Sequence, residues 1–186
     1  MILETKRLCL RPFALEDAAD VYAYAQDVRV GPIAGWPPHT SQAESREIIR
    51  TVFSAPHVFA MVLRQTGHVI GSVGFVGRCP AGDPAQEEEV GYALGHDFWG
   101  QGLVPEALEA VLTYGFTERH LRRIWCGHYG GNWRSARVIG KCGFSYCFAR
   151  TEAVPLLGQT RQCYYYAQTE EAWRERVSGA LRGRGK

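Results

Sequence analysis

Several features are scarce in this 186-residue sequence, and each scarcity excludes a class of function. The six cysteines include no C-x-x-C pair, so we expect reduced and mostly buried thiols, with neither a zinc site nor a disulfide framework. No apolar run approaches the roughly 20 residues that span a bilayer, and the chain does not begin with a signal-peptide core. Net charge is only +2, which gives no overall attraction to nucleic acid. These scarcities favour a cytoplasmic protein that uses neither a membrane nor nucleic acid as a partner.

Metal-binding and common nucleotide-binding motifs are also missing. The six histidines show no H-x-x-x-H spacing, so no metal is expected. There is no G-x-x-x-x-G-K-[ST] loop, and Gly100-x-Gly102 lacks the third glycine of a dinucleotide fingerprint. With 46% hydrophobic and 22% charged residues, the composition fits one globular domain over residues 1–186, ending in a flexible basic tail at about residues 182–186.

Strand and helix patterns alternate along the chain, which predicts a mixed α/β (α+β) domain. Glycine and proline mark loops at residues 26–40 and 78–85. Strands are expected within residues 3–13, 57–64, 69–77, 89–95, 123–129, 144–151 and 161–168. Helices are expected from Leu15, Ser41, Pro105 and Asn132, with a last helix near Trp173.

The stretch from Glu89 to Leu108 joins a strand, a glycine-rich turn and a helix start. Gly100 and Gly102 allow the backbone to bend tightly, and Pro105 suits the first turn of a helix. Unpaired amides at such a helix start bind phosphate well. The pattern therefore predicts an anion site, although a plain strand-to-helix turn has the same sequence signs. The amides concerned are those near Gly100, Gly102, Leu103 and Val104.

Two segments resemble motifs of the GCN5-related N-acetyltransferase (GNAT) superfamily. Residues 99–104 resemble its acetyl-CoA pyrophosphate loop, Q/R-x-x-G-x-G/A, and residues 132–144 resemble its N-x-x-S-x-x-x-x-x-K-x-G-F segment. The Trp-Gly-x-Gly turn is similar to the branch of ribosomal-protein alanine and serine N-terminal acetyltransferases. Val104 departs from the usual Gly/Ala, and Pro105 stands where a hydroxyl residue is frequent.

The resemblance implies a fold, a co-substrate and a set of binding residues. The fold would be a mixed, mostly antiparallel sheet of about seven strands, splayed at its centre and flanked by helices on both faces. Acetyl-CoA would enter the splay, and no metal would be needed. Arg134, Arg137 and Lys141 share one helix face that would meet its phosphates or would simply be solvated. The cofactor-binding residues implied are Ala93, Leu94, Gly95, Trp99, Gly100, Gln101, Gly102, Leu103, Val104, Asn132 and Arg137.

Acetyl transfer to an amine needs a base for the amine and a proton for the departing thiolate. Glu89 resembles the family's strand glutamate and is the candidate base, although a run of three glutamates also suits a solvated strand entry. Ser135 would lie near the thioester sulfur and supply the proton. Asn132 and Ser135 would alternatively only cap a helix. Trp36 is a candidate substrate contact or a loop anchor.

The sequence therefore favours an acetyl-CoA-dependent N-acetyltransferase that acts by direct attack in a ternary complex. Its acceptor would be a primary amine, either a protein N-terminal α-amine or a small molecule. The protein would be a monomer or a homodimer. Because of Val104 and Pro105, a catalytically weak acyl-CoA-binding or sensing module remains the alternative.

Overall fold

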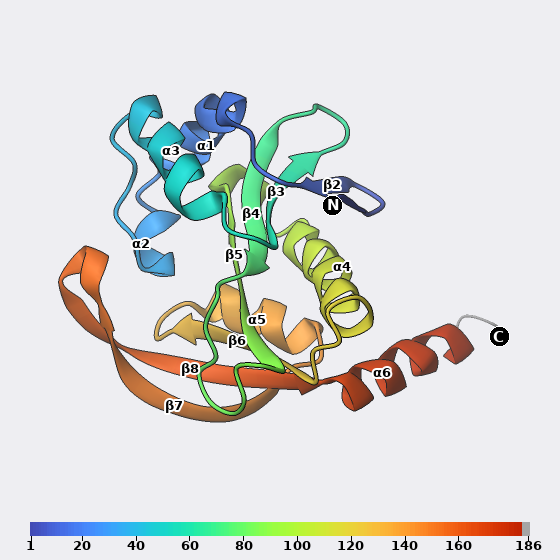
Figure 1. Ribbon diagram of the computed structural model, residues 1–186. Helices are drawn as coiled ribbons and strands as arrows, with labels where there is room; N and C mark the ends of the chain where they lie inside the picture. The colour runs from blue at the N-terminus through green and yellow to red at the C-terminus, as the bar shows by residue number, and fades with distance from the viewer. Residues whose placement is uncertain (184–186) are drawn as a thin grey trace.

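In a computed structural model, in which residues 1–183 are described, one eight-stranded sheet runs through the molecule (Figure 1). Its spatial order is β1-β2-β3-β4-β5-β6-β8-β7. Every neighbouring pair is antiparallel except β5 and β6, whose connection contains a helix, as a parallel crossover requires. The strands are β1 (Leu3–Glu4), β2 (Leu8–Arg11), β3 (Val58–Leu63), β4 (Val69–Phe75), β5 (Glu87–Leu94), β6 (Arg123–Tyr129), β7 (Ser145–Val154) and β8 (Gln159–Thr169).

Helices cover both faces of the sheet, and each group has its own hydrophobic core. The larger core joins α4, α5 and α6 to residues such as Val90 and Ile124, and the smaller joins α1 and the segment after α3 to Ala60 and Val62. The helices are α1 (Ala18–Ala25), α2 (Gly31–Ala34), α3 (Gln42–Ile48), α4 (Leu103–Thr117), α5 (Trp133–Lys141) and α6 (Glu170–Gly183). The sequence-based expectation of a sheet flanked on both faces is thus confirmed.

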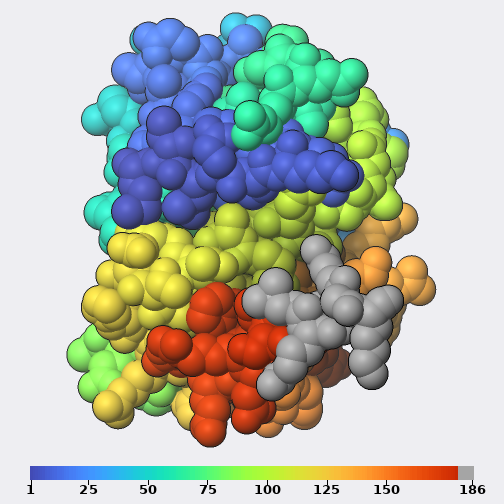
Figure 2. All heavy atoms as spheres, turned by 90° about the vertical axis from the view of Figure 1, so that its right-hand side faces the viewer, coloured from blue at the N-terminus to red at the C-terminus, as the bar shows by residue number. Residues whose placement is uncertain are grey.

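The predicted strand over residues 3–13 is a hairpin of β1 and β2, which raises the strand number to eight. Thr5 fixes the turn: its N–H donates to the carbonyl of Leu8 at 2.9 Å, and its Oγ1 accepts from the Leu8 N–H at 2.9 Å. Figure 2 shows this hairpin, in blue, lying directly against the yellow-green segment that contains α4.

Two other expectations need correction. The segment 26–40 is not loop throughout, because α2 forms one helical turn with Pro32 in its first turn, and Gly35 ends it at φ 101°. At the other end of the chain α6 continues through Gly183, so it includes the first two residues of the predicted tail. Residues 184–186 lie outside the described part. Within residues 1–183, no helix combines the length and the apolar character needed to cross a membrane.

Candidate active site

Strands β5 and β6 separate halfway along their length, and this opens a gap in the middle of the sheet. They pair only over residues 87–90 and 123–126. Beyond these residues β5 stays with β4 as far as Leu94, and β6 stays with β8 as far as Tyr129. The end of β5 therefore has a strand partner on one side only.

The direction of the peptide groups shows what faces this gap. The N–H of Glu89 donates to Arg78 O and that of Gly95 donates to Ile70 O. The N–H and C=O of the odd-numbered residues of β5 therefore point towards β4 and the segment that follows it. This direction alternates from one residue to the next along a strand, so the N–H and C=O of Tyr92 and of Leu94 point into the gap. Leu94 O accepts a hydrogen bond from Trp99 Nε1 at 2.8 Å. The N–H and C=O of Tyr92 and the N–H of Leu94 therefore remain to bind a ligand.

The turn that follows β5 has the shape expected of an anion-binding loop. Gly100 and Gly102 have φ of 77° and 74°, left-handed values that other residues rarely adopt, and Gly102 is the N-cap of α4. The amides at the start of α4 lack intrahelical partners, and the helix dipole favours an anion there. Val104 is buried and contributes to the wall beside this turn.

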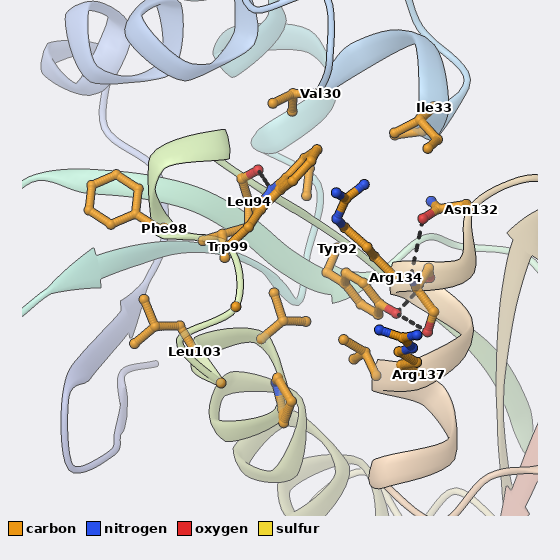
Figure 3. A pocket seen from close by; sticks show the side chains of 18 of the residues that line it. Val30, Ile33, Tyr92, Leu94, Phe98, Trp99, Leu103, Asn132, Arg134 and Arg137 are labelled. Atoms are coloured by element: carbon orange, nitrogen blue, oxygen red, sulfur yellow. Dashed lines mark hydrogen bonds between the residues drawn. The ribbon is translucent and has the colours of Figure 1, made fainter.

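A cavity of about 320 Å³ lies between this turn, the end of β5 and α5 (Figure 3). Three cations of α5 line it, Arg134, Arg137 and Lys141, and within residues 1–183 no acidic side chain lines it. The Arg134 guanidinium lies 4.8 Å from the centre of the Trp99 ring. A cavity with this charge suits a ligand that carries several phosphates. The acetyl donor implied by the sequence resemblance is such a ligand, so we call this the donor cavity.

Most of the residues expected to bind the cofactor meet in the donor cavity. Gly95 and Gln101 are the exceptions: the N–H of Gly95 is already bonded to Ile70, and the Gln101 side chain is exposed and donates to Asp97 O at 3.2 Å. Those that line the cavity are Ala93, Leu94, Trp99, Gly100, Gly102, Leu103, Val104, Asn132 and Arg137.

A second cavity of about 880 Å³ continues through the gap towards β3 and β4. Glu89, Arg78 and Trp36 line it, and we call it the acceptor cavity. The half-buried Trp36 ring also packs on Gly31, which has no room for a Cβ, so Trp36 both anchors its loop and lines the cavity. The two cavities share Ile33, Ala34, Tyr92, Ala93, Asn132 and Ser135.

Glu89 lies on the acceptor side and is only 4% exposed. Its carboxylate accepts hydrogen bonds from Arg78 Nε at 2.5 Å and Nη2 at 3.1 Å, and the same guanidinium lies 3.7 Å from Glu152. Burial raises the pKa of Glu89, and the Arg78 charge offsets part of this rise. The run of three glutamates is not a solvated strand entry, because Glu88 pairs with Arg119 and Glu87 with Arg123.

Ser135 lies where the two cavities meet and lines both of them, in the first turn of α5. Its Oγ is 2.7 Å from the hydroxyl of Tyr92, and its backbone N–H donates to Asn132 Oδ1 at 3.1 Å. Asn132 therefore caps the helix, whereas the Ser135 hydroxyl does not. Burial raises the pKa of Tyr92 well above its ordinary value, so this phenol stays protonated.

Sequence reasoning missed Tyr92, Arg78 and Glu152. Tyr92 is one of several apolar residues that alternate along β5, and only the separation of the strands places it between the cavities. Arg78 and Glu152 come from a loop and from β7, which no local pattern connects to Glu89. Within residues 1–183, no three His, Cys, Asp or Glu side chains are grouped to hold a metal ion.

Comparisons with known proteins agree with this geometry. A family model described as an acetyltransferase (GNAT) domain matches residues 7–145. The uncharacterized N-acetyltransferase p20 of Bacillus licheniformis is 31% identical over 151 residues, which cover 76% of this chain and 81% of that protein. The ribosomal protein uS5 alanine N-acetyltransferase of Escherichia coli (strain K12) is 30% identical over 84 residues, 45% of this chain and 43% of that one. A GNAT-family acetyltransferase structure from Bacillus anthracis has a TM-score of 0.81 at 25% identity, covering 92% of this chain and 99% of that chain.

Proposed function

Because this chain belongs to the GNAT acetyltransferase family, we propose that it transfers an acetyl group from acetyl-CoA directly to a primary amine. The observation that carries this proposal is the meeting of two cavities at the gap between β5 and β6. A donor on one side and an acceptor on the other would both be bound at once, as transfer in a ternary complex requires.

The donor cavity fits the chemistry of acetyl-CoA. Its pyrophosphate would meet the amides at Gly102 and the first turn of α4, and its other phosphate the cations of α5. The amide groups of its pantetheine arm would pair with the N–H and C=O of Tyr92 and with the N–H of Leu94. The thioester would then lie at the junction of the two cavities.

We assign proton removal to the acceptor side and stabilisation of the leaving group to the junction. Glu89, buried on the acceptor side, would take a proton from the attacking amine, directly or through water. The Ser135 hydroxyl would donate a hydrogen bond to the departing sulfur, which leaves as a thiolate and takes its proton from solvent. A covalent cysteine route is disfavoured. Cys126 and Cys163 line the acceptor cavity, and burial raises the pKa of both thiols, which keeps them in their weakly nucleophilic form.

The acceptor is proposed as either a protein N-terminal α-amine or a small amine. The relative in Escherichia coli named for ribosomal protein uS5 supports the first class. An α-amine has a pKa near 7.7 to 8.0, so part of it is already neutral at physiological pH and needs only modest help from a base. A lysine side chain, with a pKa near 10.4, would need more.

Acetyl-CoA is expected to bind and to raise the stability of the protein. At a concentration one hundred times its dissociation constant, a ligand that binds only the folded state adds about 2.7 kcal/mol. Thermal unfolding with and without acetyl-CoA measures this gain, and calorimetry measures the affinity. An unchanged melting temperature together with no binding heat would contradict the proposal.

Release of free thiol in the presence of amines separates an enzyme from a sensing module. The panel should include peptides with N-terminal alanine or serine, amino acids and polyamines. Binding followed by thiol release with one of them supports the transferase. Tight binding without thiol release from any of them would support the acyl-CoA-sensing alternative, which Val104 in the wall of the donor cavity favours.

Ser135→Ala is expected to lower turnover by about tenfold, the loss of about 1.4 kcal/mol that one hydrogen bond to a developing charge provides. The loss should be the same at every pH, because a larger supply of neutral amine does nothing for the leaving group. Steady-state kinetics between pH 6 and 9 measure this effect. Affinity for acetyl-CoA and the melting temperature serve as controls, since Asn132 still caps α5 in the variant. Unchanged turnover would show that another group stabilises the departing thiolate.

A further inference from the structure

The N-terminal hairpin is fastened to the start of α4 by a small group of hydrogen bonds. Glu106, in the first turn of α4, accepts from Thr5 Oγ1 at 2.6 Å and from the Arg7 N–H and Nε, both at 2.7 Å. Arg7 Nη1 donates in turn to the carbonyl of Gln101 at 2.8 Å. Residues about one hundred positions apart in the sequence therefore meet beside the glycine turn, where Figure 2 shows the hairpin against α4.

The contact with Gln101 fixes the direction of a neighbouring amide. The peptide bond between Gln101 and Gly102 is trans, so its C=O and its N–H point in opposite directions. Arg7 holds the oxygen on the side of the hairpin, which turns the Gly102 N–H to the other side. Gly102 lines the donor cavity, whereas neither Gln101 nor Arg7 does.

A glycine-rich turn needs such a contact to keep one conformation. This peptide turns over by rotation about ψ of Gln101 and φ of Gly102, and glycine adopts positive and negative φ about equally well. Gly102 has no side chain that would oppose this rotation, and an inverted peptide would present a carbonyl oxygen to the anion. A hydrogen bond to the Gln101 oxygen from outside the turn opposes that inversion.

Glu106 keeps Arg7 in place. Its side chain is 19% exposed and that of Arg7 is 42% exposed, so the guanidinium is held by the carboxylate and not by burial. Partial burial raises the pKa of Glu106, but hydrogen bonds from Thr5 and Arg7 lower it by more, and the carboxylate stays ionised at neutral pH.

We propose that Arg7 is a positioning residue for the donor: it holds the Gln101 carbonyl so that the Gly102 amide faces the phosphates in the donor cavity. Arg7 itself touches neither substrate. This inference rests on the proposed function, because it takes the pyrophosphate of acetyl-CoA as the anion. It assigns the β1–β2 hairpin a role in cofactor affinity that its distance along the sequence does not suggest.

Arg7→Gln tests this inference, with Arg64→Gln as a matched control. Arg64 follows the end of β3, forms an exposed ion pair with Glu4 of the hairpin, and lines neither cavity. Calorimetry with acetyl-CoA should show a dissociation constant about tenfold higher for Arg7→Gln, and the wild-type value for Arg64→Gln. In kinetics with Arg7→Gln, the KM for acetyl-CoA should rise while kcat stays within about twofold. Melting temperatures of the two variants should fall by similar, small amounts.

Acetyl-pantetheine, which lacks the phosphates, distinguishes positioning from general damage. Its kcat/KM should be the same for wild type and Arg7→Gln, since the Gly102 amide has no anion to bind. An equal loss with acetyl-pantetheine, or a wild-type affinity of Arg7→Gln for acetyl-CoA, would overturn the role of Arg7 and leave the proposed function intact. Failure of the wild-type protein to bind acetyl-CoA would overturn both.

Discussion

Gly102→Val is expected to raise the dissociation constant for acetyl-CoA about 100-fold, which equals about 2.7 kcal/mol. Gly102 has φ of 74°, and a β-branched residue in this left-handed region loses about 1–2 kcal/mol. The turn would leave that conformation, and the hydrogen bond from the amide to a charged phosphate, worth about 1.5–3 kcal/mol, would be lost with it. Calorimetry with acetyl-CoA measures the change.

Gly67→Val is the matched control for this variant. Gly67, in the turn between β3 and β4, has φ of 76°, and an added Cβ there meets nothing within 4 Å. At Gly102 the atom nearest to an added Cβ is Arg7 Nη2, at an ordinary 3.7 Å, so the Cβ clashes at neither position. Both should therefore lower the melting temperature similarly, while only Gly102→Val weakens the cofactor. An equal and small effect of both on affinity would mean that the turn is only structural.

Glu89→Gln should lower turnover about a hundredfold at neutral pH, within the usual range for loss of a general base. The wild-type base acts only when ionised, and burial raises the pKa of Glu89, so wild-type turnover should fall as the pH drops through that raised value. The variant lacks this acid limb. Its deficit should shrink as the pH rises towards the acceptor's own pKa, about 7.7–8.0 for an α-amine, because more amine is then neutral unaided. Rates between pH 6 and 9 measure the profile.

Loss of stability does not account for this expected deficit. The pKa of Glu89 is raised in the folded state, so the stability that it contributes is greatest at low pH and is lost as the pH rises through the raised value. At neutral pH the glutamine variant should therefore melt near the wild-type temperature, since the partner Arg78 is half-exposed and remains solvated.

Glu87→Gln is the control for the turnover of Glu89→Gln, because Glu87 lies on the same strand and the same side of it but lines neither cavity. Wild-type turnover of Glu89→Gln across this pH range would remove Glu89 from the proposed mechanism.

Elements with strong local signals were predicted closely from the sequence. Strand β6 has the expected bounds, 123–129, and most of its residues are buried because it lies between two other strands of the sheet. Asn132 caps α5 and Gly143 follows it with φ of 80°, because a side-chain oxygen and the missing Cβ of glycine act within a few residues. The hairpin at residues 3–13 was missed because its turn depends on one threonine side chain rather than on glycine or proline.

The parts of the candidate site also differ in whether a local sequence pattern can predict them. The glycine turn and the capped helix lie within single short segments, so a motif shows them directly. The pairings that complete the site join distant segments: Arg78 with Glu89, Tyr92 with Ser135, and Arg7 with Gln101. A sequence pattern gives the direction of a side chain along its own strand or helix, but not which distant residue it meets.

By itself the sequence determined most of the order of strands and helices, the turn at Gly100 and Gly102, and the cations of α5, because each follows from neighbouring residues. The family resemblance implied a central splay, but only the tertiary structure decided that β5 and β6 separate after Val90 and Cys126. That separation depends on which strands remain paired elsewhere, β5 with β4 and β6 with β8, and pairing between segments far apart is a property of the whole sheet. The gap, the junction of the two cavities, and the placing of Ser135 at that junction and of Glu89 on the acceptor side all follow from it.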